Sequence, residues 1–315
     1  MADVKKMATR EAYGNALCSL APKYDFVVLD ADLAAATKTG IFKKQYPERF
    51  FDCGIAEGNM MSVAAGIAST GKTVFASSFA MFASGRAFEQ VRNSIGYPHL
   101  NVKIGATHGG ISVGEDGATH QCNEDFATMR SIPEMVIINP ADAVETRAAV
   151  EAAILHDGPV YMRFGRYALP VLYEENNYKF ELGKGVLMAD GSDVTLVGTG
   201  FMVSTCLEAR ELLAAEGISA RVINIHTIKP IDKEIITRAA EETGALVTAE
   251  EHTIYGGLGS AVAEVLVENC PVPMSRVGVE DTFGRSGTVP ALMEYYGLTA
   301  ENIAKRAKQV IARKK

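Results

Sequence analysis

Residues 106–121 read ATHGGISVGEDGATHQ, and they follow a short apolar run, residues 102–106, that predicts a buried strand. The stretch holds two histidines, two acidic residues and four glycines among its sixteen positions. Because it leaves the carboxyl end of a strand, it lies at the edge of the sheet where α/β proteins bind their ligands. Histidine and carboxylate together can move protons or orient hydroxyl groups. A single histidine in a loop is usually a solvated surface residue, but the composition of the whole stretch favours a functional site.

Short apolar runs alternate with longer amphipathic runs on both sides of this loop. Several of the short runs lack the two-residue alternation of a half-exposed strand, which is typical of strands buried in a parallel sheet. In the first half of the chain the runs predict strands at residues 25–29, 50–51, 73–76, 102–106, 135–138 and 160–163, and helices at residues 59–69 and 141–155.

A polar and aromatic stretch, residues 173–184, interrupts this pattern, which then restarts. The second half predicts strands at residues 194–197, 220–225 and 245–249, and helices at residues 202–215, 233–242, 260–267 and 301–312. Strands separated by helices indicate mostly parallel sheets that are flanked by helices. We therefore predict an α/β protein of two such domains, residues 1–172 and 186–315, which are joined by a linker at residues 173–185.

The overall composition excludes several classes of protein. The chain has 315 residues, of which 48% are hydrophobic and 22% charged, as in ordinary globular proteins. Its 31 basic and 38 acidic residues give a net charge of -7, which argues against a nucleic-acid partner. The five cysteines are widely spaced, and no apolar run approaches the roughly 18 residues of a membrane span. We expect a soluble cytoplasmic protein with no membrane partner and no metal site of its own.

Other segments are ambiguous when taken one at a time. Glu57 lies at the start of an apolar helix, where the helix dipole alone would stabilise a carboxylate. Phe79, Phe82 and Phe88 have near-helical spacing, which is more often typical of a core than of a cofactor pocket. The glycine-rich turn at residues 198–200 lacks the further glycine of a dinucleotide site, so a tight strand-to-helix turn is favoured.

Taken together, these segments resemble the transketolase family of thiamine-diphosphate enzymes. The run GEDGATHQ at residues 114–121 is similar to the family's GEDGPTHQ loop, with Ala118 in place of proline. The run AEGNM at residues 56–60 resembles the family's glutamate motif. Three further runs stand in the family's order, namely ATR at residues 8–10, ADL at residues 31–33 and GRYALP at residues 165–170. The resemblance covers essentially the whole chain.

The resemblance implies a pyrimidine-binding domain followed by a transketolase C-terminal domain. It implies transfer of a two-carbon ketol unit between sugar phosphates, as in pentose phosphate metabolism, with thiamine diphosphate and Mg²⁺ as cofactors. Full-length members begin with a diphosphate-binding domain that carries a GDG motif and a later asparagine, and this sequence has no GDG. We therefore expect the C-terminal subunit of a two-chain transketolase. It would be active only with an N-terminal subunit that binds most of the Mg²⁺, in a heterotetramer with two copies of each chain.

The resemblance also implies roles for individual residues around the cofactor. Glu57 would hydrogen-bond N1′ of the aminopyrimidine, and Phe79 and Phe82 would stack on that ring. Asp32 would lie near the cofactor. His120 would assist proton transfers at the hydroxyl groups of the substrate. A third aromatic residue of the family's pocket is replaced here by Ala76.

A second set of residues is implied to bind the sugar. Asp116 and His120 would contact its hydroxyl groups, and Asp116 would recognise their configuration. Arg10, His108 and Arg166 would bind its phosphate, for which guanidinium groups have suitable geometry. One serine that contacts phosphate in the family is replaced by Ala36.

Three alternatives remain open on the sequence. A 1-deoxyxylulose-5-phosphate synthase shares the core of the loop, but usually lacks the QCNED continuation at residues 121–125. The β subunit of a 2-oxoacid dehydrogenase shares the two-domain layout, but its loop generally lacks the GEDG-x-THQ run. A non-catalytic binding or regulatory homologue would have kept the fold and lost the chemistry. The intact Glu57 and His120 argue against that last alternative.

Overall fold

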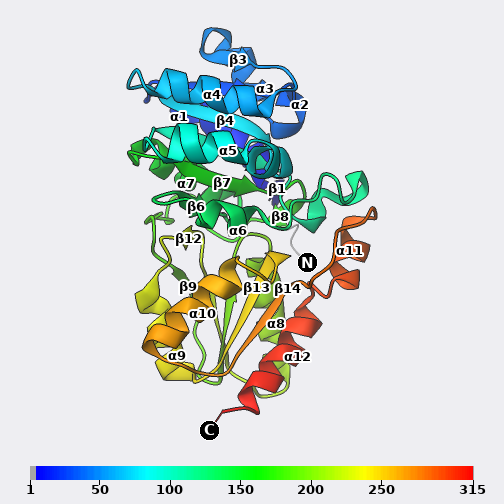
Figure 1. The fold of residues 1–315 in the computed structure, drawn as a ribbon. Coiled ribbons are helices and arrows are strands. Elements are labelled where there is room, and N and C mark those ends of the chain that lie inside the picture. The colour runs from blue at the N-terminus through cyan, green and yellow to red at the C-terminus, as the bar shows by residue number, and fades with distance from the viewer. Residues whose placement is uncertain (1–4, 315) are drawn as a thin grey trace.

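The computed structural model describes residues 5–314, so the first four residues of the first predicted domain and the last residue of the second lie outside it. Figure 1 shows two sheets, one above the other, each flanked by helices. The prediction of an α/β fold with two mostly parallel sheets is confirmed. Residues 173–185 contain no helix or strand, as predicted for a linker, although the domain boundary itself remains a prediction.

The first sheet has seven strands, in the order β12-β6-β7-β5-β4-β2-β3. All pair in parallel except β12, because their connections run back across the sheet faces. The bounds are β2 (Phe26–Asp30), β3 (Phe50–Asp52), β4 (Thr73–Phe79), β5 (Val102–Thr107), β6 (Val136–Ile138), β7 (Val160–Phe164) and β12 (Thr227–Lys229). The short strand β12 comes from the second half of the chain and joins the two halves, which the sequence pattern does not predict.

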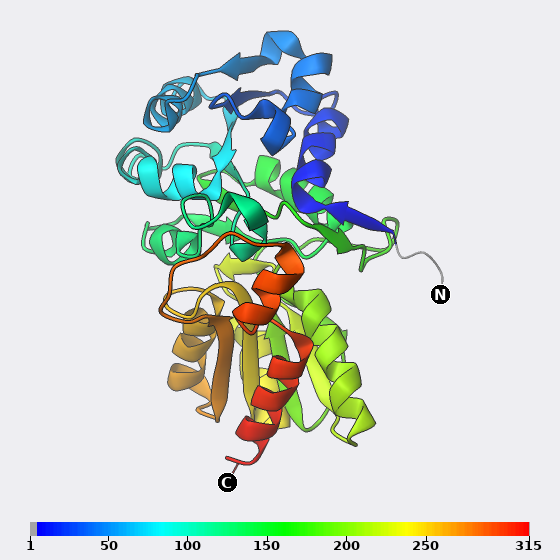
Figure 2. The ribbon, with the colours of Figure 1, turned by 90° about the vertical axis from the view of Figure 1, so that its right-hand side faces the viewer.

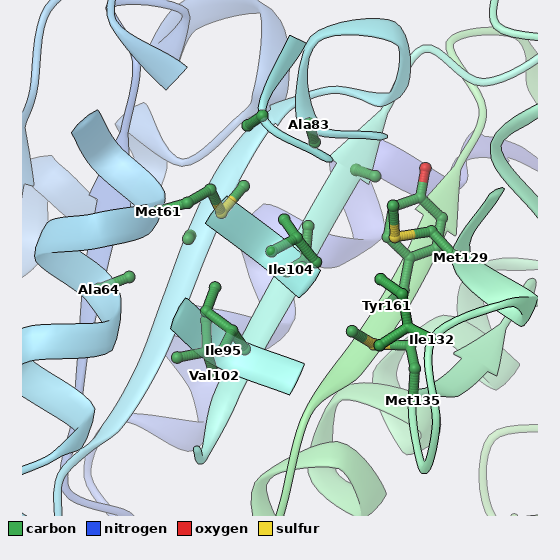
Figure 3. Close-up of a cluster of buried hydrophobic side chains, with 14 of the residues drawn as sticks. Met61, Ala64, Ala83, Ile95, Val102, Ile104, Met129, Ile132, Met135 and Tyr161 are labelled. Atoms are coloured by element: carbon green, nitrogen blue, oxygen red, sulfur yellow. The ribbon is translucent and has the colours of Figure 1, made fainter. Parts of the chain in front are cut away.

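Helices cover both faces of the first sheet. One face packs on α1 (Thr9–Leu20), α3 (Gly40–Gln45) and α7 (Ala143–Leu155). The other packs on α4 (Glu57–Ala68), the π-helical turns η2 (Met81–Arg86) and η3 (Val91–Gly96), and α6 (Asp125–Arg130). Figure 3 shows this second core, where Met61 of α4, Ile104 of β5 and Tyr161 of β7 belong to one buried cluster. Shorter elements are α2 (Ala34–Thr37), η1 (Pro47–Arg49), α5 (Phe88–Gln90) and η4 (Ile111–Asp116).

The second sheet has five strands, in the order β14-β13-β10-β11-β9, of which only β9 is antiparallel. The bounds are β9 (Val186–Ala189), β10 (Val194–Gly198), β11 (Ala220–Asn224), β13 (Leu246–Thr253) and β14 (Met274–Val279). Helices α8 (Met202–Ala215) and α12 (Ala300–Ile311) cover one face, and α9 (Lys233–Thr243) and α10 (Leu258–Asn269) the other. Figure 2 shows α12 running along this sheet. The remaining elements are α11 (Val289–Tyr295) and a two-stranded ribbon of β1 (Lys6–Ala8) and β8 (Ala168–Pro170).

A buried arginine joins the two sheets. Arg163 of β7 has its Nε atom 3.0 Å from Oδ2 of Asp125, at the start of α6. Its other guanidinium nitrogens donate to the backbone carbonyls of Cys122, at 2.9 Å, and of Glu251 in β13, at 2.8 Å. The Tyr161 hydroxyl also donates to Asp125, at 2.9 Å. One guanidinium therefore fixes the end of the 106–121 loop to both halves of the chain.

Two glycines of that loop are required by this packing. A Cβ atom on Gly109 would lie 2.0 Å from Nε of Arg163. Gly110 has a φ of +82°, which disfavours other residues, and a Cβ atom there would lie 2.5 Å from the Glu251 carboxylate. The glycine-rich composition of the loop therefore partly reflects close packing between the two halves. The turn at residues 198–200 is likewise structural, because a Cβ atom on Gly200 would lie 2.3 Å from the Asn139 side chain.

Within residues 5–314, no helix has both the length and the apolar composition that crossing a membrane requires.

Asp125→Asn should lower the free energy of unfolding by about 3–5 kcal/mol, because it leaves the buried Arg163 guanidinium without its carboxylate. Urea unfolding followed by circular dichroism measures this. Glu264→Gln is the matched control, since it removes an exposed ion pair with Arg130 across the same seam, and we expect a change of at most about 1 kcal/mol. Similar losses in the two variants would contradict a special role for the buried pair.

Candidate active site

Four of the predicted site residues lie at one edge of the first sheet because of its topology. Strands β2, β4, β5 and β7 are neighbours and parallel, so their carboxyl ends meet at the same edge. Asp32 follows β2, Phe79 ends β4, His108 follows β5 and Arg166 follows β7. Residues that are far apart in the sequence are thereby gathered at one site.

Aromatic rings form the centre of this site. Phe79 stacks on His108 with 3.8 Å between ring centroids and on Phe82 with 5.8 Å. His120 lies edge-on to both phenylalanines, 6.1 Å from Phe79 and 5.4 Å from Phe82. The near-helical spacing of the phenylalanines is misleading, because Phe79 ends a strand and Phe82 lies in the π-helical turn η2. Turns of this kind occur frequently at functional sites.

Glu57 is connected to these rings through Arg86. It is the first residue of α4, and its side chain is 1% exposed. Its Oε2 atom accepts a hydrogen bond from Nη1 of Arg86 at 2.9 Å. The Arg86 guanidinium also lies over the Phe82 ring, 4.6 Å from its centroid. The sequence gives no sign of Arg86 as a site residue, because its partner is 29 positions away.

Arg10 and His108 contact each other at the same edge of the sheet. Arg10 of α1 donates from Nη1 to the carbonyl oxygen of Ala36, at 2.8 Å, and lies 3.1 Å from Nε2 of His108. Burial lowers the pKa of His108 to about 3, with a further contribution from Arg10 and Arg166. The ring is therefore neutral near pH 7. Since Nε2 accepts from Arg10, the proton lies on Nδ1, which faces the Thr107 hydroxyl at 2.9 Å.

Arg166 is held by acidic residues of the 106–121 loop. Its Nη1 atom lies 3.7 Å from Glu115 and 3.5 Å from Asp116, and it donates to the Val113 carbonyl. Both acidic side chains are exposed. Arg10 and Arg166 are close enough that the charge of Arg166, after burial, lowers the pKa of Arg10. The edge therefore carries two nearby cations, one of which is partly neutralised.

Asp32 lies at the rim of the site. It is exposed, with a φ of +61°, and its backbone amide donates to Oδ1 of Asp52 at 3.1 Å. Beneath it the buried Asp30, which the sequence does not single out, accepts from the Thr37 and Thr39 hydroxyls at 2.7 and 2.8 Å. Burial raises the pKa of Asp30 to about 6. This carboxylate orders the segment that carries Asp32 and positions Ala36 against Arg10.

The site opens into a hollow of about 660 Å³ between the two halves of the chain. Phe82, Arg86 and Thr119 line it from the first half, and Thr253 and Phe283 from the second. The Phe283 side chain is 90% exposed. Among residues 5–314, no group of three or more histidine, cysteine, aspartate or glutamate side chains is arranged to hold a metal ion.

The family of the chain follows from comparison with known proteins. Residues 5–171 match the family model for the transketolase pyrimidine-binding domain, and residues 183–303 match the one for the transketolase C-terminal domain. The chain belongs to the transketolase family, and the resemblance seen in the sequence is confirmed.

Several relatives match the chain over nearly its whole length. It is 52% identical to a protein of Methanocaldococcus jannaschii named as a transketolase C-terminal section, over 94% of each chain. It is 47% identical to the 6-deoxy-6-sulfo-D-fructose transketolase subunit SqwH of a Clostridium strain, over 97% of this chain and 95% of that one. A solved structure described as a split-gene transketolase in an inactive beta4 tetramer has 50% identity and a TM-score of 0.91, over 99% and 100% of the two chains.

Proposed function

We propose that this chain is the C-terminal subunit of a two-chain transketolase and supplies the aminopyrimidine half of the thiamine diphosphate site. The observation that carries the proposal is the buried Glu57 carboxylate, whose partner Arg86 lies over the Phe82 ring and lines an open hollow. A planar heteroaromatic ring with nitrogen atoms fits such a place, because one face can stack while a ring nitrogen meets the carboxylate. The relatives named as C-terminal sections or subunits support the two-chain arrangement.

The residues of this chain would have distinct chemical tasks. When bound, thiamine diphosphate supplies a carbon nucleophile at its thiazolium ring and an electron sink. Glu57 would hold a proton at N1′ of the aminopyrimidine, and its low exposure keeps water from competing for that proton. Phe79 and Phe82 would orient the ring. His120, edge-on to both, would exchange protons with the substrate hydroxyls, whose configuration Asp116 would recognise, and Asp32 would lie at the rim near the cofactor.

The diphosphate end of the cofactor requires ligands from a second chain. A diphosphate with Mg²⁺ requires oxygen ligands for the metal, and residues 5–314 offer no cluster of acidic or histidine side chains for it. We propose that a chain carrying the GDG motif and a later asparagine docks across the hollow and binds Mg²⁺. Two copies of each chain would form the assembly, since two-fold symmetry is the commonest. The tetramer of the split-gene neighbour supports self-association of this chain as well.

The substrates would be sugars with an anionic end. Arg10 and Arg166, which both lie near the neutral His108, offer donors that suit a phosphate group. Because Glu115 and Asp116 already pair with Arg166, an incoming anion would have to displace or share these contacts. The names of two relatives, one for a sulfo-fructose and one for apulose-4-phosphate, support an anionic ketose or aldose as the substrate class.

The two relatives with the higher identities are named as a transketolase section and a transketolase subunit, not as the synthase that the sequence leaves open. Identity to a 1-deoxy-D-xylulose-5-phosphate synthase is 38%, over 96% of this chain and 47% of the synthase, compared with 47% and 52% for the subunits. A non-catalytic homologue would have no need to retain both Glu57 and His120.

The direct test of the proposed function is reconstitution. Calorimetry should detect no micromolar binding of thiamine diphosphate with Mg²⁺ to the chain alone, and the chain alone should transfer no ketol unit. Adding the diphosphate-binding chain should restore both. Micromolar binding by the isolated chain, or turnover without a partner, would contradict the division of the site between two chains.

Arg166→Ala in the assembled enzyme should raise KM for a phosphorylated ketose about ten- to a hundred-fold, since a charge-assisted hydrogen bond is lost. KM for the unphosphorylated sugar should change little. Arg147→Ala is a matched control, because Arg147 is an exposed arginine of α7 that also has an acidic neighbour. Equal effects of Arg166→Ala on both sugars would show that Arg166 has a structural role instead.

A further inference from the structure

Arg86 connects the two parts of the site that would hold the cofactor ring. It is the last residue of η2, and its guanidinium contacts Glu57 at 2.9 Å and the Phe82 ring at 4.6 Å. The two partners differ greatly in exposure, since the Arg86 side chain is 55% exposed and that of Glu57 is 1% exposed. The pair is therefore a buried acceptor covered by a donor that reaches in from the surface.

The burial of the Glu57 carboxylate explains why the Arg86 guanidinium lies against it. An ionised carboxylate removed from water costs free energy unless an opposite charge or hydrogen-bond donors compensate it. In the isolated chain Arg86 supplies both through one contact. Any ligand that takes the acceptor Oε2 of Glu57 must compete with this guanidinium.

The contacts of the guanidinium match those that the aminopyrimidine would need. Both groups are planar, stack on aromatic faces and can meet a carboxylate through nitrogen. Arg86 already covers the Phe82 ring and donates to Glu57. The guanidinium and an aminopyrimidine bound to the same oxygen and the same ring face would overlap.

We propose that Arg86 is a displaceable stand-in for the aminopyrimidine, which stabilises Glu57 in the isolated chain and moves into the hollow when the ring binds. This inference rests on the proposed function. The path is open, because Arg86 lines the hollow of about 660 Å³ and more than half of its side chain is already in solvent. The pair thereby weakens binding of the ring alone, so the cofactor is retained only when a partner holds its charged end.

The test uses the isolated chain and the free ring, 4-amino-5-hydroxymethyl-2-methylpyrimidine, with binding followed by NMR titration. Arg86→Gln should bind this ring roughly two- to tenfold more tightly than the wild type, because the competing ion pair is removed. Arg92→Gln is the matched control, since Arg92 is an exposed arginine of the following turn whose side chain contacts Asn93. It should leave the affinity unchanged.

Chemical rescue separates displacement from a general structural effect. In Arg86→Ala, millimolar methylguanidinium should compete with the pyrimidine ring, because it can enter the place that the side chain has left. In the double variant Arg86→Gln with Glu57→Gln, the tighter binding of the pyrimidine ring that Arg86→Gln alone produces should disappear. Circular dichroism of every variant checks that the fold is retained.

The outcomes distinguish this inference from the proposed function. Equal or weaker binding by Arg86→Gln, with binding that still depends on Glu57, would overturn the stand-in role and leave the pyrimidine site standing. If no variant binds the ring, or if Glu57→Gln changes nothing in any background, both the site and the stand-in role are wrong.

Discussion

The guanidinium of Arg163 is the contact on which the geometry of the site depends. It lies in the seam between the two sheets, paired with Asp125 and bonded to the carbonyls of Cys122 and Glu251. The Glu251 carboxylate in turn accepts from the backbone amide of Ser112. The loop is thus tied to the second half of the chain directly at Ser112 and, through Arg163, at Cys122 just after the loop, so it presents its histidines at a fixed edge.

Because of these contacts, the C-terminal half helps to shape a site whose residues lie mainly on the first sheet. The proposed site residues lie on the first half, but the hollow that Phe82 and Arg86 line is also lined by Thr253 and Phe283 of the second half. The aromatic rings and Glu57 suit one end of thiamine diphosphate. Residues 5–314 contain no cluster of acidic or histidine side chains that could hold the metal at the charged end. The Arg86–Glu57 pair is consistent with a site that a second chain completes.

Much of the fold could be predicted from the sequence because its signals are local. Non-alternating apolar runs separated by amphipathic ones locate the parallel strands, and the predicted helix at residues 202–215 has the same bounds as α8. Phe79 and His108 lie at the same edge because the carboxyl ends of neighbouring parallel strands meet there. The joining of β12 to the first sheet could not be predicted, since three residues carry no periodicity. Neither could the Arg86–Glu57 pair, which depends on the π-helical turn η2 and on packing between distant segments.

The most direct test of the account is hydrogen–deuterium exchange at C2 of thiamine diphosphate in the assembled two-chain enzyme. Exchange reports proton removal from the thiazolium before any sugar is involved. If the Glu57 carboxylate drives this step, Glu57→Gln should slow exchange about 10²–10⁴-fold, the usual contribution of a positioned acid or base, while cofactor remains bound. An unchanged exchange rate in Glu57→Gln would contradict the central claim that this chain supplies the activating carboxylate.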